Sequence, residues 1–203
     1  MSRISYQPLK PRKVPRQPRS AETVASIIEA AAQVLETAGL EGFNTNAVAR
    51  RAGVSIGSLY QYFPGKDALI LALMRRERAR FYEDAAAALG KRSGKAALEY
   101  LIGASVRQQL QRPVLARLLD VEESRPGLRK EMAASDTFQS LLVTIIERAK
   151  PGQKRPEVAA GDMLAMIRGI VDAAGERREK DIGYLERRVR SALFGYLSKI
   201  GKD

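Results

Sequence analysis

The stretch "FNTNAVARRAGVSIGSLYQYF", residues 43–63, decides the fold. Asn44 can cap a first short helix, and Gly53 permits the left-handed backbone that ends it. Ser55 can cap a second short helix, in which Leu59 and Phe63 lie four residues apart on one inner face. Two short helices joined by a tight turn that contains glycine predict a helix-turn-helix.

Longer helices are expected on either side of this motif. Before it, apolar residues at intervals of three and four predict a helix over 20–38, with Ser20 as its N-cap and Gly39 as its stop. After it, a Pro-Gly pair ends the second short helix, and a long helix is expected over 66–89.

The rest of the chain has helical periodicity and no alternating strand pattern. The expected fold class is therefore all-α, with about nine helices divided between a small N-terminal module and a larger C-terminal one. The further helices are expected over 95–110, 114–123, 128–150, 157–174 and 182–200.

Histidine and cysteine are both absent from the 203 residues. Their absence removes disulfides, thiolate nucleophiles, and imidazole bases and metal ligands. We therefore expect no catalytic residues, no metal and no cofactor; an enzyme would depend on carboxylates, lysine or tyrosine. No apolar run is long enough to span a bilayer, and the N-terminus has no secretory apolar segment, so a cytoplasmic protein is expected.

The formal net charge is +12, which favours a polyanionic partner, either nucleic acid or an anionic membrane surface. A high isoelectric point without such a partner is the alternative. Residues 1–80 hold 13 basic and 6 acidic side chains, so this part carries more than half of the excess. Residues 1–19 hold four prolines and six basic residues and predict a flexible basic arm, which either lies along DNA or is solvated without a role.

The run "FNTNAVARRAGVSIGSLYQYFPGKDALI", residues 43–70, resembles the TetR family of bacterial transcriptional regulators. The resemblance covers roughly residues 20–75, and beyond residue 80 only the family's helical plan is matched. It implies a DNA-binding domain over 20–66 and a regulatory and dimerisation domain over 67–203. The residues that it places at DNA are Asn44, Thr45, Asn46, Ser55, Ile56, Gly57, Ser58, Tyr60, Gln61, Tyr62 and Lys66.

The chemistry of these residues supports the same roles. Gly57 allows a close approach to base edges, Ile56 suits the methyl group of thymine, and Gln61 either pairs with adenine or makes no specific contact. Phosphate contacts from Tyr60, and from Tyr62 and Lys66 after it, would set the register without reading sequence.

The resemblance also implies a homodimer and an effector pocket. The expected effector is an apolar or amphipathic small molecule, although the adjacent acids Glu122 and Glu123 suit a cation if they are not simply solvated. The candidate pocket residues, which fit a plain core equally well, are Leu101, Ser105, Gln108, Leu115, Leu118, Phe138, Leu142 and Ile145. The candidate dimer residues, which alternatively close the core of one chain, are Leu164, Ile167, Val171, Leu185, Val189, Leu193 and Leu197.

Together these observations predict a homodimeric repressor that a small-molecule effector releases from a palindromic operator on double-stranded DNA. Two alternatives stay open at this point. One is a DNA-organising protein without sequence specificity, and the other is an enzyme built on carboxylates, for which no paired acids stand at a recognisable spacing.

Overall fold

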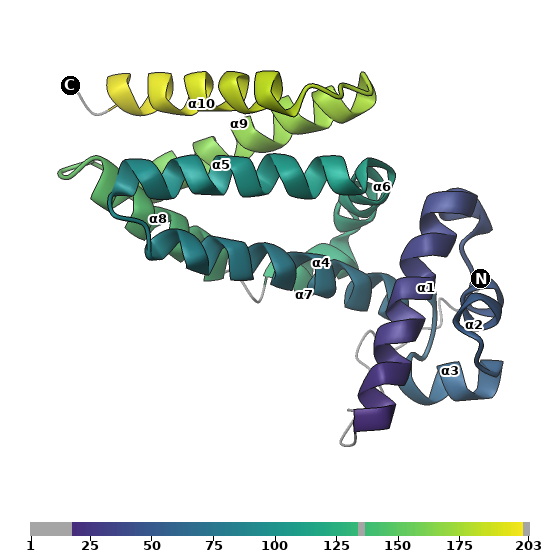
Figure 1. The fold of residues 1–203 in the computed structure, drawn as a ribbon. Coiled ribbons are helices and arrows are strands. Elements are labelled where there is room, and N and C mark those ends of the chain that lie inside the picture. The colour runs from purple at the N-terminus through teal and green to yellow at the C-terminus, as the bar shows by residue number, and fades with distance from the viewer. Residues whose placement is uncertain (1–17, 134–136, 201–203) are drawn as a thin grey trace, which may run out of the picture. The chain divides into compact units, whose positions relative to one another are not determined.

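The structure, a computed structural model, describes residues 18–133 and 137–200, and every regular element within them is an α-helix (Figure 1). This confirms the all-α fold class. No helix in the described ranges is long and apolar enough to cross a membrane. The ten helices of these ranges are α1 (Pro18–Gly42), α2 (Thr45–Ala52), α3 (Ile56–Tyr62), α4 (Lys66–Leu89), α5 (Gly94–Gln111), α6 (Pro113–Glu123), α7 (Pro126–Ala133), α8 (Thr137–Ala149), α9 (Pro156–Glu176) and α10 (Ile182–Lys199).

The residue contacts divide the chain into two compact units. Of the described residues, the first unit holds 18–77 and 118–133, and the second holds 78–117 and 137–200. Helices α4 and α6 each supply residues to both units. The first unit therefore contains the helix-turn-helix together with the end of α6 and the whole of α7.

Helix α1 differs from its expected form at its start and agrees with it at Gly39. It begins at Pro18, so Ser20 lies within the first turn and is not the N-cap. Proline suits this position because its ring presets the helical φ and it has no N–H group to satisfy. Gly39, with φ 64° and ψ −172°, leaves the helical conformation as expected, and a short turn continues to Gly42.

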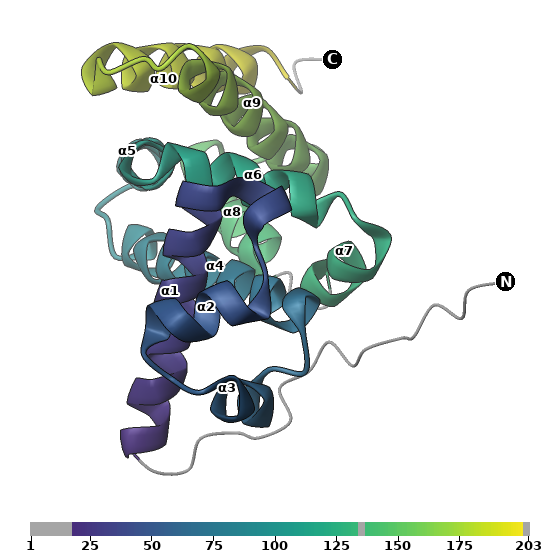
Figure 2. The same ribbon diagram turned by 90° about the vertical axis from the view of Figure 1, so that its right-hand side faces the viewer.

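The core of the first unit forms where α1 packs on α2 and α2 packs on α3. Figure 2 shows α1 crossing α2, with α3 at the edge of this unit. The largest side chains that are fully buried here include Ile27 and Leu35 of α1, Phe43 before α2, and Leu59 and Phe63 at α3. The inner face that the sequence assigned to Leu59 and Phe63 is thus confirmed.

One long helix was expected over 128–150, and this expectation is wrong. The structure has two helices, α7 and α8, and residues 134–136 between them lie outside the described residues. The two helices belong to different compact units, so each buries its apolar residues in a different core. Apolar spacing could not reveal the break because both pieces carry a helical pattern.

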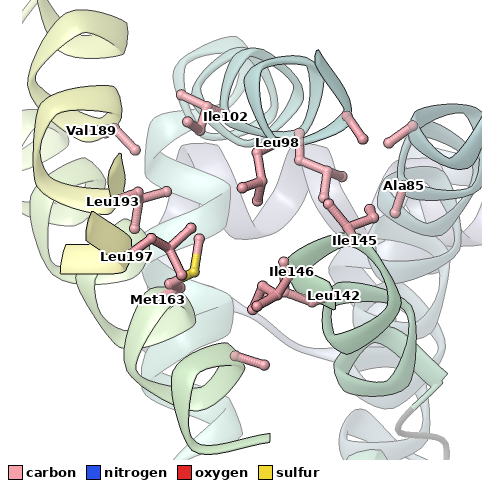
Figure 3. Close-up of a cluster of buried hydrophobic side chains, with 14 of the residues drawn as sticks. Ala85, Leu98, Ile102, Leu142, Ile145, Ile146, Met163, Val189, Leu193 and Leu197 are labelled. Atoms are coloured by element: carbon pink, nitrogen blue, oxygen red, sulfur yellow. The ribbon is translucent and has the colours of Figure 1, made fainter. Parts of the chain in front are cut away.

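The core of the second unit is one cluster of buried apolar side chains from α4, α5, α8, α9 and α10 (Figure 3). Ile102 of α5 lies on the side of Val189 of α10, while Leu197 of α10 lies beside Met163 of α9. Gly94 lets α5 start against the end of α8, because a Cβ there would overlap backbone atoms of Arg148 and Ala149.

Candidate nucleic-acid interface

Local caps build the helix-turn-helix as the sequence predicts. The Asn44 side chain accepts a hydrogen bond from the N–H of Ala47 at 2.9 Å and so caps α2. Gly53 ends α2 with a left-handed φ of 68°. Ser55 then caps α3, with its Oγ accepting from the N–H of Ser58 at 3.0 Å. Because all of these bonds join close neighbours in sequence, the turn is set locally.

The two faces of α3 differ sharply in exposure. Leu59 and Phe63 are 0% and 1% exposed and hold the helix to the first unit. Gln61 lies two residues from each of them, which at 100° per residue places it on the opposite, exposed face. Ile56 and Tyr60 are 38% and 40% exposed, so both side chains are open to an outside partner in the part of the chain that the structure describes.

A hydrogen bond joins the first residue of α2 to α3. Thr45 Oγ1 and Tyr60 Oη are 3.1 Å apart, and either hydroxyl can be the donor. One of the two O–H protons is used between them, and the other is left for an outside acceptor such as a phosphate oxygen. The pair therefore presents one donor at the exposed edge of the motif.

Three other polar candidates, Asn44, Ser55 and Ser58, are held by local bonds at the starts of these helices. Asn44 Nδ2 donates to the carbonyl of Gly42 at 3.0 Å while its oxygen caps α2. The hydroxyls of Ser55 and Ser58 are 2.8 Å apart and bond to each other. Asn46 is exposed and Tyr62 is half-buried.

Lys66 has an internal partner that the sequence did not indicate. Its Nζ donates to the carbonyl oxygen of Leu40 at 2.9 Å and lies 5.7 Å from the centroid of the Phe43 ring. These contacts fix the ammonium group beside the loop between α1 and α2. An ammonium group has three N–H donors, so this bond leaves two for other acceptors.

Two arginines at the end of α2 were missed as candidates. Arg50 and Arg51 are both exposed and occupy the last turn of α2. Arg51 Nε donates to Gln33 Oε1 of α1 at 2.7 Å, a bond that ties the two helices together. The available signal was the "RR" pair directly before the turn, next to the residues that the resemblance named.

Comparison with known proteins settles the family. A family model described as "Bacterial regulatory proteins, tetR family" matches residues 27–73, and one described as "Tetracyclin repressor-like, C-terminal domain" matches residues 95–197. The chain belongs to the TetR family. The resemblance found in the sequence is thus confirmed, and it extends through most of the second unit.

The similar proteins are regulators of transcription. The chain is 32% identical over 164 residues to the HTH-type transcriptional repressor DrrR1 of Streptomyces coeruleorubidus. The aligned region covers 80% of this chain and 56% of that protein. It thus spans little more than half the length of this relative. These relatives are named as transcriptional regulators, a class of proteins that are not enzymes.

Two solved structures share the fold. The fatty acid degradation regulator FadR from Bacillus halodurans has a TM-score of 0.77 and 19% identity, with coverage of 90% of this chain and 97% of that one. FadR from Bacillus subtilis, solved in complex with stearoyl-CoA, has a TM-score of 0.73 and 20% identity, with coverage of 83% and 96%. At these identities the likeness shows the TetR-family fold alone.

The residues proposed from the sequence for the TetR-family effector pocket lie mainly in the core. Leu101, Leu142 and Ile145 are buried together in the cluster of the second unit, and Leu115 is also buried. Ser105 donates its hydroxyl to the carbonyl of Leu101 at 2.9 Å. Gln108 and Leu118 are half-buried, and the side chain of Phe138 lies outside the described residues.

Glu122 is neither solvated nor open to a cationic effector. It is only 7% exposed, and its Oε2 lies 2.6 Å from a guanidinium nitrogen of Arg125. The same guanidinium binds both carboxylate oxygens of Asp67 at the start of α4, each at 2.8 Å. These hydrogen bonds, first to Asp67 and then to Glu122, raise the pKa of Arg125 above its ordinary value.

The residues chosen from the sequence for a TetR-family dimer interface lie in or against the core of the single chain. Five of them are buried within the single chain, and the half-buried Leu164 and Ile167 pack against the same cluster. For the five buried residues this favours the alternative that they close the core of one chain, and the dimer interface itself stays a prediction. The five buried residues are Val171, Leu185, Val189, Leu193 and Leu197.

Proposed function

We propose that this TetR-family protein is a repressor that binds a palindromic operator as a homodimer and leaves it when a small-molecule effector binds. The observation that carries the proposal is the exposed, uncharged outer face of α3, held from behind by Leu59 and Phe63. A short helix anchored on one side and bare on the other suits insertion into the major groove.

The DNA contacts proposed for this face fall into two groups. The pair Thr45–Tyr60 supplies one hydroxyl donor to a phosphate, and Tyr62 and Lys66 flank it. Such contacts fix the register of the protein on the duplex without reading bases. The second group, from Ser55 to Gln61, would face base edges. We place the DNA-binding domain at residues 20–66. Of the basic arm expected over 1–19, residues 1–17 lie outside the described residues, and Pro18 and Arg19 begin α1.

A homodimer is supported by the outer faces of α9 and α10. Gly161, Ala165 and Gly169 follow one another at intervals of four along α9 and are all exposed. A Cβ added at Gly161 or Gly169 would meet no atom within 4 Å in the single chain. Exposed Ser191 and Gly195 give α10 a similar outer face. Small side chains let helices from two protomers approach closely, and two half-sites require two protomers.

The effector proposed is apolar or amphipathic. An effector held between α5, α8, α9 and α10 would be surrounded by the apolar side chains of that core, as ligand sites between helices usually are. The Bacillus subtilis FadR structure holds stearoyl-CoA in the same fold, which makes long-chain acyl-CoA a first compound to test. Such a regulator acts on chromosomal DNA, so we place it in the cytoplasm.

Selection of bound duplexes from a random library tests the proposal. A repressor of this kind should enrich one palindrome, hold it against excess unrelated duplex, and release it when one member of a compound panel is added. Affinity should fall steeply with salt because phosphate contacts release counterions. Equal competition by every duplex would instead favour a DNA-organising protein without sequence specificity. Turnover of a substrate by the purified protein would favour the alternative of an enzyme built on carboxylates.

A further inference from the structure

The outer face of α3 carries no charged side chain. The residues from its N-cap to its last turn are "SIGSLYQY", 55–62, and contain no lysine, arginine, aspartate or glutamate. The commonest specific contact to guanine comes from arginine or lysine at O6 and N7. Helix α3 therefore lacks the side chains that usually read guanine.

Gln61 is a polar side chain on the exposed face of α3. It is exposed, lies opposite the buried Leu59, and follows Gly57 by one helical turn on the same face. Side chains of a helix lean toward its N-terminus, so the Gln61 amide extends over Gly57, where no side chain obstructs it. The Gln61 amide has a donor and an acceptor side by side, which matches N7 and N6 of adenine.

Among the residues that the structure describes, no contact explains the glycine at position 57. Its backbone φ is not in the left-handed region, and an added Cβ would meet only Ser55 Oγ, at 3.8 Å. Glycine also lowers helix stability relative to alanine, so packing within the chain gives it no advantage. A glycine here would allow a base edge to approach the helix backbone closely.

Several polar groups near this face are partly engaged by bonds within the chain. The hydroxyls of Ser55 and Ser58 bond to each other, and Lys66 donates to the carbonyl of Leu40. Arg51 of α2 is tied to Gln33 of α1. On α3 itself, the amide of Gln61 and the aliphatic surface of Ile56, which is 38% exposed at the first turn, are the side-chain groups best placed to meet base edges.

We propose that α3 reads A·T base pairs, with Gln61 bonded to N7 and N6 of an adenine and Ile56 packed on the C5 methyl group of a thymine. This inference rests on the DNA-binding function and names the class of half-site that the helix selects. Guanine and cytosine positions in the operator are then read by other parts of the protein or through DNA shape.

Modified bases test the two contacts separately. Starting from the selected operator, each thymine is replaced in turn by deoxyuridine, and each adenine by 7-deazaadenine. Loss of the methyl group packed on Ile56 should weaken binding about threefold to fourfold. Loss of the adenine N7 should weaken it by roughly fivefold or more, since one of the two bonds of a bidentate pair is removed.

Variants then assign each base to its side chain. Ile56→Ala should no longer respond to deoxyuridine at that thymine, and Gln61→Ala should no longer respond to 7-deazaadenine. Gln61→Arg should shift the selected base from adenine to guanine. Tyr60→Phe is the matched comparison, because loss of a phosphate contact should weaken binding to all duplexes without changing the base preference. Thermal unfolding of each variant verifies that it is folded.

The outcomes separate the two proposals. Enrichment of no particular sequence would overturn the sequence-specific function itself. Two other results would overturn the reading of A·T pairs while leaving the sequence-specific function in place. One is a palindrome whose response to modified bases does not depend on Ile56 or Gln61. The other is a Gln61→Arg variant with unchanged base preference.

Discussion

Arg125 and Asp67 are joined by two parallel hydrogen bonds, with nitrogen–oxygen distances of 2.8 Å each. A further bond of 2.6 Å links Arg125 to Glu122, so one guanidinium serves two carboxylates from α6 and α4. All three residues lie in the first unit. The arrangement fastens the end of α6 to the start of α4, directly after the helix-turn-helix.

Loss of Arg125 should cost more stability than loss of Asp67. Arg125→Ala leaves the buried Glu122 carboxylate without this partner, so we expect the free energy of unfolding to fall by about 1–3 kcal/mol. The side chains of Asp67 and Arg125 are 38% and 43% exposed, so Asp67→Asn should cost less than about 1 kcal/mol. Urea unfolding followed by circular dichroism measures both, and equal losses would contradict the ranking.

Replacement of Gly57 by alanine should move stability and DNA affinity in opposite directions. Alanine favours the helix by about 0.5–1 kcal/mol, and the new Cβ has open space within the chain. At a close protein–DNA contact the same methyl group should cost about 1–3 kcal/mol of binding. Thermal unfolding and a fluorescence anisotropy titration with the selected operator give the two readouts. Unchanged affinity would show that Gly57 does not lie against the duplex.

Asp172 should make the stability of the second unit depend on pH. Burial raises the pKa of its carboxyl above the ordinary 3.8, Arg168 opposes the rise, and Glu176 adds to it. The folded chain thus binds this proton more tightly than the unfolded chain, and that stabilisation, complete below pH 3.8, is lost as pH rises through the raised pKa.

Asp172→Asn removes this ionisation and keeps an oxygen for Gln109, whose Nε2 donates to Asp172 Oδ1 at 3.0 Å. We therefore expect the variant to be more stable than the parent at pH 7, and the difference to shrink as pH falls toward 4. Urea unfolding over a pH series measures it. A difference that stays constant with pH would contradict the assignment to Asp172.

A charge at the centre of the small-residue face of α9 should separate the proposed dimer. Ala165 is exposed, so Ala165→Glu should leave the single chain folded but bury a carboxylate between protomers, which is costly without a partner. Analytical ultracentrifugation should show monomers at concentrations where the parent is dimeric. Ala86→Glu, at an exposed position of α4, is the matched control and should remain dimeric. Identical behaviour of the two variants would place the interface elsewhere.

The helix-turn-helix could be predicted from the sequence because its determinants are local. The caps at Asn44 and Ser55 each bond to an N–H three residues later, and Gly53 supplies its own left-handed φ. The inner face of α3 follows from the spacing of Leu59 and Phe63 alone. Each of these features needs only a few neighbouring residues to be recognised.

The rest depends on contacts between residues far apart in sequence. The apolar stripe of α10 predicts that Leu185 and Leu193 are buried, but not whether the same chain or a partner covers them. Likewise, the sequence suggests that Glu122 is solvated, whereas in the structure it bonds to Arg125, which also binds Asp67 of α4. Helical periodicity identifies a buried face, whereas the identity of what covers it is decided by the tertiary fold.

The bond between Thr45 and Tyr60 also affects how the motif meets DNA. A tyrosine that samples several rotamers in the free protein must give up that freedom on binding, which weakens association. Here the Tyr60 hydroxyl is already held 3.1 Å from Thr45 before any duplex arrives. If the proposed phosphate contact forms, part of the ordering of the Tyr60 side chain is therefore already completed during folding.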